Sequence, residues 1–148
     1  MSQPLQDLWP ADLVAPDVMT PHAILQYQAE QLARRTNRLI EAEVRRETPK
    51  GEWTVLTFEL VAPAVHGYRK PLFRVMHDPV MVYPARIDDF DEEDPEPYSV
   101  AGQPELMEAL KRIFASNGVR SIIHSLIALS NEKGRPEGSV RPLQTGGV

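Results

Sequence analysis

The chain of 148 residues contains no cysteine. Disulfide bonds, thiolate zinc sites, iron–sulfur clusters and cysteine nucleophiles are therefore excluded. A chain without cysteine fits a reducing compartment. The sequence also lacks any run of about 20 apolar residues, the length that a membrane-spanning helix needs. Its first twenty residues have neither a basic leader nor a long apolar stretch. We therefore expect a cytoplasmic protein that does not use a membrane.

Histidine is scarce, and the four histidines are too far apart in the sequence to form a recognised metal-ligand pattern. Glycine-rich phosphate loops and nucleophile elbows are absent as well. No basic face or known module indicates nucleic-acid binding. We therefore expect no catalytic residue, metal site or cofactor, and the sequence favours a protein that is not an enzyme.

Negative charge is concentrated in one place. Seven acidic residues and no basic residue lie between Asp88 and Glu96, and without them the net charge of −5 would become +2. Prolines, charge and the lack of any period predict a loop from Asp88 to Gln103. Counted from Asp88, the stretch does not match an EF-hand calcium loop, because the glycine and glutamate required at the sixth and twelfth positions are replaced by Glu93 and Ser99. The loop is either a solvated connector or a contact for a basic partner.

The first 19 residues predict an extended arm. Apolar residues including Leu5, Leu8, Trp9 and Leu13 are scattered among three prolines with neither a helical nor an alternating period. Leaving that much apolar surface in water is unfavourable. We expect the arm to pack on its own domain or on a second subunit.

A long helix is predicted to follow the arm. Thr20 can cap it, Pro21 suits its first position, and Pro49 forces a stop near Glu47. Apolar residues recur at steps of three and four along this stretch. The opposite face would carry acid–base pairs at helical spacing, namely Glu30 with Arg34, Glu41 with Arg45, and Glu43 with Arg46.

Three β-rich runs, at 53–61, 68–77 and 80–87, predict an antiparallel meander. Alternation assigns Leu56, Phe58, Leu60, Phe73 and Val75 to a core face. The second face is mixed, and its apolar residues Val55, Leu72 and Met76 need a cover, which the arm or a symmetry mate could provide. On that face we expect Arg74 to lie opposite Glu59.

A helical hairpin is predicted after the acidic loop, with one helix from Pro104 to Asn117 and a second from about Val119 to Lys133. The glycine- and proline-rich residues 134–148 predict a flexible tail. The fold class is therefore α+β, with residues 20–133 as one domain and the helices packed on one face of the sheet.

Two functional hypotheses remain open. The first is a small non-catalytic intracellular protein, with an accessory, inhibitor or immunity-like role, that binds another macromolecule and forms a homodimer through the second sheet face or the arm. Its candidate partner-binding residues are Asp88, Asp89, Asp91, Glu92, Glu93 and Asp94. The alternative is a small-ligand-binding or enzymatic domain that uses polar groups of the first β-hairpin, namely His66, Tyr68, Arg69 and His77.

Overall fold

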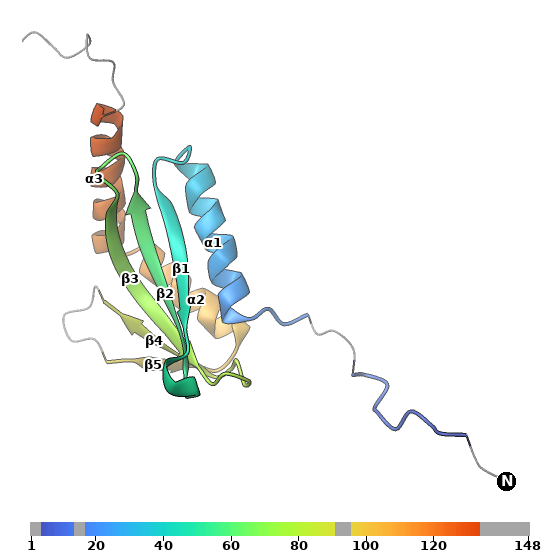
Figure 1. The fold of residues 1–148 in the computed structure, drawn as a ribbon. Helices are drawn as coiled ribbons and strands as arrows, with labels where there is room; N and C mark the ends of the chain where they lie inside the picture. Colours follow the sequence, from blue (N-terminus) through green and yellow to red (C-terminus); the bar gives the residue numbers. More distant parts are fainter. Residues whose placement is uncertain (1–3, 14–16, 91–95, 134–148) are drawn as a thin grey trace, which may run out of the picture.

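The computed structural model describes residues 4–13, 17–90 and 96–133. They form one antiparallel sheet of five strands, three α-helices and a short 3₁₀ helix (Figure 1). The predicted α+β class is confirmed, but the sheet has five strands and not three. In chain order the elements are α1 (Pro21–Arg35), β1 (Glu41–Glu47), η1 (Pro49–Gly51), β2 (Thr54–Ala62), β3 (Tyr68–His77), β4 (Ala85–Asp89), β5 (Tyr98–Val100), α2 (Gln103–Phe114) and α3 (Asn117–Lys133).

Helix α1 begins as predicted and ends twelve residues earlier than predicted. The Thr20 hydroxyl accepts a hydrogen bond from the amide of Ala23 at 3.2 Å, and proline occupies the first turn. The helix stops at Arg35, whereas the sequence pattern predicted a helix to Glu47. Residues 41–47 instead form strand β1, so the helical pairing predicted for Glu41 with Arg45 and for Glu43 with Arg46 is wrong.

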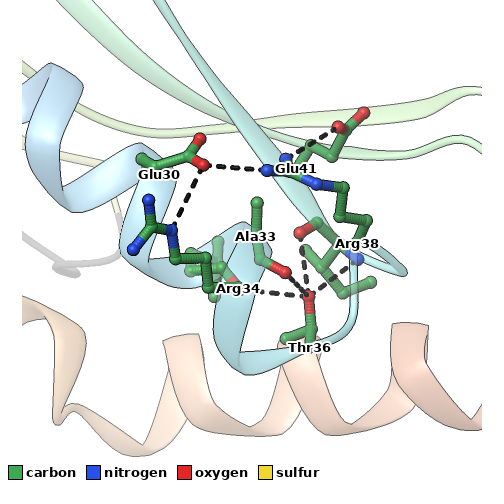
Figure 2. Close-up of polar contacts among 8 residues, drawn as sticks. Glu30, Ala33, Arg34, Thr36, Arg38 and Glu41 are labelled. Atoms are coloured by element: carbon green, nitrogen blue, oxygen red, sulfur yellow. Dashed lines mark hydrogen bonds and ion pairs between the residues drawn. The ribbon is translucent and has the colours of Figure 1, made fainter.

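The side chain of Thr36 organises the turn between α1 and β1 (Figure 2). Its hydroxyl lies 3.0 Å from the carbonyl oxygens of both Leu32 and Ile40, and it accepts a hydrogen bond from the Ile40 amide at 3.1 Å. Asn37 and Arg38 then take left-handed backbone conformations with φ of 51° and 62°. One hydroxyl thus satisfies backbone groups on both sides of a chain reversal, which sends the following residues back as a strand.

The strands lie in the sheet in sequence order, each antiparallel to the next. Strand β2 is paired along its length with β1 and with β3. The third predicted strand, 80–87, starts later, at Ala85, and continues to Asp89. Strand β5 lies at 98–100, inside the predicted acidic loop, and was missed. The sheet is therefore wider than the predicted meander by one strand at each edge.

The predicted core face is buried beneath the helices. Phe58 is 1% exposed, and its ring stacks on Phe73 with 5.2 Å between centroids. Phe114 of α2 is tilted against both rings, at 5.4 and 5.9 Å. The other core-face residues predicted from the alternation, Leu56, Leu60 and Val75, are also buried. Residues of α1, α2 and α3 complete the same cluster.

A β-bulge changes the predicted position of Leu72. Phe58 pairs with Phe73, but the next residue, Glu59, pairs with Pro71, so Leu72 has no partner in β2. Two residues of β3 therefore oppose one register position of β2, and the alternation of faces is interrupted. Leu72 is buried beside Phe58 and Leu60. Its assignment to the second face, with Val55 and Met76, is therefore wrong.

Helices α2 and α3 correspond to the predicted hairpin. The residues predicted to end the first helix, Asn117 and Gly118, instead begin α3, and α2 stops at Phe114. The predicted flexible tail, 134–148, lies outside the described residues. Of the predicted N-terminal arm, residues 4–13 and 17–19 are described, and they run away from the domain without helix or strand (Figure 1).

Replacing Phe58 tests the aromatic core. We expect Phe58→Ala to lower the free energy of unfolding by about 3–5 kcal/mol, because it removes a buried ring that packs on two others. Urea denaturation measures this loss. The control is Val80→Ala at an exposed site, which should change stability by less than about 0.5 kcal/mol. Equal losses in both variants would contradict the assignment of the core face.

Replacing Thr36 tests the turn. Thr36→Val keeps the shape of the side chain but removes the hydroxyl, and we expect it to lower the free energy of unfolding by about 1–3 kcal/mol. Thr36→Ser retains the hydroxyl and should lose clearly less. If the valine variant unfolds at the same urea concentration as the unmodified chain, the hydroxyl does not hold the turn.

Candidate functional site

A groove of about 340 Å³ opens over the helix-covered face of the sheet, between α1 and α3. Its floor consists of the buried side chains of Phe58, Leu60 and Leu72. Its accessible apolar surface comes from the partly buried residues Leu32 and Phe114, together with Ile123 of α3. In Figure 1, α1 runs beside β1 and α3 lies on the β3 side of the sheet, and residues of both helices line the cavity. Gln28, Gln31, Arg35 and Val119 complete the lining.

A second cavity of about 460 Å³ adjoins the first between α1 and α2. The two cavities adjoin at Gln28 and Phe114, which line both of them. The other residues that line the second cavity are Met107, Glu108, Leu110, Lys111 and Ala115. Below, the two cavities together are called the helix groove.

The helix groove combines an apolar interior with a polar rim. Gln28 and Gln31 offer amide donors and acceptors, and the exposed Arg35 and Lys111 add positive charge against the single acid Glu108. An apolar cleft with a few polar groups at its edge is typical of a binding site. Among the described residues of the lining, Arg35, Lys111 and Glu108 carry charge, and these residues include no carboxylate pair and no histidine for acid–base chemistry.

The opposite face of the sheet carries a cluster of ion pairs around Glu59, which is only 6% exposed. The Arg69 guanidinium lies 2.9 Å from Glu59 and 2.6 Å from Glu43, and Arg45 lies 3.9 Å from Glu59. The hydrogen bond from Arg69 is the main reason why the pKa of Glu43 lies below its ordinary value. Hydrogen bonds to Glu43 and Glu59 raise the pKa of Arg69 in turn. Because these charges satisfy one another, we interpret the cluster as structural.

The structure describes two of the six predicted partner-binding acids. Asp88 lies in β4 and forms an ion pair with Arg74 at 3.0 Å. The expected pairing of Arg74 with Glu59 is therefore wrong: in the register of β2 and β3, Arg74 lies opposite Thr57 and Glu59 lies opposite Pro71. Asp89 lines a small cavity with Tyr98 and Arg112. The other four acids, Asp91, Glu92, Glu93 and Asp94, lie outside the described residues, and their role stays a prediction.

The four hairpin residues of the alternative hypothesis do not gather in one place. His66 is exposed at the tip of the β2–β3 turn, and Tyr68 begins β3. Arg69 is held by Glu43 and Glu59. His77 is buried at the opposite end of β3, with its Nδ1 2.7 Å from the carbonyl oxygen of Asp78. A ten-residue strand is roughly 33 Å long, so His77 is far from the other three.

The described parts of the chain contain neither a metal-binding cluster nor a helix that could span a membrane. No three histidine or acidic side chains there gather closely enough to hold a metal ion. No helix there combines the length and the apolar character needed to cross a membrane.

The sequence patterns did not reveal the helix groove. Leu32, Phe114 and Ile123 belong to regular apolar stripes, and such stripes normally indicate only burial. What distinguishes these residues is that they come from α1, α2 and α3 and line one cavity together. Their meeting depends on packing between elements distant in the chain, which single-element periodicity cannot show.

Comparisons of the chain with models of protein families, with curated proteins and with solved structures gave no match. The helix groove is therefore interpreted from its own side chains.

Replacing Arg69 tests the ion-pair cluster. Among the described residues, Arg69→Met leaves the buried Glu59 with the more distant Arg45, and we expect a lower free energy of unfolding at neutral pH. The control is Arg34→Met, which removes an exposed partner of Glu30 and should lose less than about 1 kcal/mol. Urea denaturation of both variants measures the difference.

The effect of Arg69→Met should depend on pH. The folded-state pKa of Glu43 lies below its ordinary value of 4.5, so its contribution to stability is present above that value and disappears as the pH falls through the folded-state pKa. The stability gap between the unmodified chain and the variant should therefore narrow from about pH 5 downward. A gap that stays constant in acid would show that Arg69 acts through packing alone.

Proposed function

We propose that this protein is a small, non-catalytic protein-binding domain that holds an apolar segment of another protein chain in the helix groove. The observation that carries the proposal is the groove itself, in which Leu32, Phe114 and Ile123 offer apolar surface above a rigid floor. Uncovered apolar surface that is concave and rimmed by polar groups marks an interaction site more often than a scattered exposed residue does.

A peptide segment suits the shape of the groove better than a compact ligand. The first cavity follows α1 from Gln28 to Arg35, roughly 11 Å of helix, and the second continues from Gln28 along α2. A chain lying there could place apolar side chains inward while Gln28 and Gln31 bind its backbone. The positive charge of Arg35 and Lys111 favours a segment that also carries acidic residues.

The absence of acid–base groups in the lining supports a binding role over an enzymatic one. An accessory, inhibitor or immunity-like role in the cytoplasm, with a homodimer as the working form, belongs to this proposal. The acidic residues after β4 remain a second candidate contact, for a basic surface of the partner. The ligand-binding alternative would need His77 to join His66, Tyr68 and Arg69, and the geometry of β3 offers no support for that.

Selection of peptides tests the proposal. Peptides of about 12–16 residues, selected from a random display library on the unmodified protein, should contain apolar residues with acidic neighbours. Two groove variants, Leu32→Glu and Ile123→Glu, should each weaken binding of the selected peptides by about tenfold or more, because they place a charge in the apolar lining.

Matched controls place the same new charge outside the groove. Gln26→Glu on α1 and Ser125→Glu on α3 alter exposed positions of the same two helices and should leave peptide binding unchanged. Circular dichroism of all four variants checks that each of them is folded. Selected peptides that bind the groove variants and the controls equally well would contradict the proposal.

A further inference from the structure

The N-terminal arm is an apolar segment of this chain that lacks a cover. Trp9 is 74% exposed, and Leu5, Leu8 and Leu13 are exposed as well. Each described residue of the arm before α1 lies outside the core, and the arm extends away from the domain (Figure 1). Burying one such side chain is worth about 1.5–3 kcal/mol, so an arm with four of them should find a surface.

The base of the arm is fixed to the domain. The amide of Met19 donates a hydrogen bond to the side-chain oxygen of Gln103 at 2.9 Å, and the carbonyl oxygen of Met19 accepts one from the Tyr83 hydroxyl at 3.0 Å. Both backbone groups of Met19 are thus occupied, one by α2 and one by the loop before β4. These two bonds hold Met19 against the domain, and the described residues 4–13 lie away from it.

The arm and the helix groove are complementary in chemistry. The arm carries Asp7, Asp12 and Asp17 and no basic residue among its apolar groups. The groove is lined by apolar side chains, with Arg35 and Lys111 at its rim beside one acid, Glu108. The arm therefore matches the acidic, apolar segment that the groove should prefer.

The arm is also long enough for this role. From Trp9 to Met19 an extended chain reaches roughly 35 Å, which exceeds the roughly 11 Å of α1 between Gln28 and Arg35 that lines the groove. An arm that leaves its own domain could therefore lie along the whole groove of a neighbouring molecule.

We infer that two copies of this chain exchange arms, so that the apolar arm of each copy lies in the helix groove of the other. The inference rests on the proposed function of the groove and names its resting occupant. A reciprocal exchange buries both arms and fills both grooves in a dimer with one two-fold axis. Two-fold symmetry is the commonest symmetry of protein dimers. A partner segment that enters the groove has to displace the arm of the second copy.

The fluorescence of Trp9 tests the inference directly. The full-length Trp53→Phe variant retains Trp9 as its single tryptophan. Its emission maximum should move to shorter wavelength as the protein concentration rises through the micromolar range, in parallel with a doubling of the mass measured by light scattering. The companion variant Trp9→Phe, which reports on Trp53, should dimerise less and show no such shift.

Groove variants in the Trp53→Phe background locate the contact. Ile123→Glu should abolish the shift, and the control Ser125→Glu should keep it. Arg35→Glu alters an exposed side chain that the core does not need, and it should raise the concentration at half-shift several-fold by repelling the acids of the arm.

Three outcomes would overturn the inference. An emission maximum at short wavelength at every concentration, with a monomeric mass, would place the arm in its own groove. Emission of an exposed tryptophan at every concentration would show that the arm does not dock. A concentration-dependent shift that survives Ile123→Glu would place the dimer contact elsewhere. Peptide binding to the groove is measured separately, so it can succeed where the arm exchange fails.

Discussion

The burial of Phe58 is the constraint on which the rest of the structure depends. Its ring stacks on Phe73 of the neighbouring strand and packs against Phe114 of α2, so it joins the centre of the sheet to the helical layer. The same ring also forms part of the floor of the helix groove. Core and candidate site are therefore one packed unit. A binding surface that is held in place by the core loses little conformational freedom on binding, which favours affinity.

The alternation and helical periods of the sequence predicted the α+β class, the start of α1, strands β2 and β3, the buried residues of the core face and the two C-terminal helices. They failed at the end of α1. Ala42 and Val44 of β1 continue a helical apolar pattern as well as they fit a strand, and Pro49 offered a convincing stop. The true stop is a tertiary arrangement in which one hydroxyl, that of Thr36, bonds both to the last turn of the helix and to Ile40. Short apolar runs cannot distinguish such a turn from a continuing helix.

The bulge in β3 explains why the second face of the sheet differs from the prediction. Strict alternation places Leu72 on the same face as Arg74, but the extra residue moves Leu72 into the core and leaves Arg74 beside Asp88. What remains on that face around Glu59 is a set of charges that neutralise one another. The charges on that face therefore need no covering subunit, and the apolar helix groove lies on the other side of the sheet. The groove could not be predicted because it arises where the packing of two helices is incomplete.

A single chain leaves apolar side chains exposed both on the N-terminal arm and in the helix groove. A compact domain of this size would ordinarily bury one of these two surfaces against the other. The two bonds at Met19 fix the base of the arm to the domain, and exchange with a second copy keeps both of them while it buries the apolar surface of the arm. Exchange in turn costs translational and rotational freedom on association. That cost arises once per dimer, whereas the dimer gains two arm–groove contacts. The gain from burying the arms is offset by this loss of freedom, so the fraction of exchanged dimer falls as the protein is diluted. In the proposed exchange, the helix groove is then open to another chain when the protein is dilute.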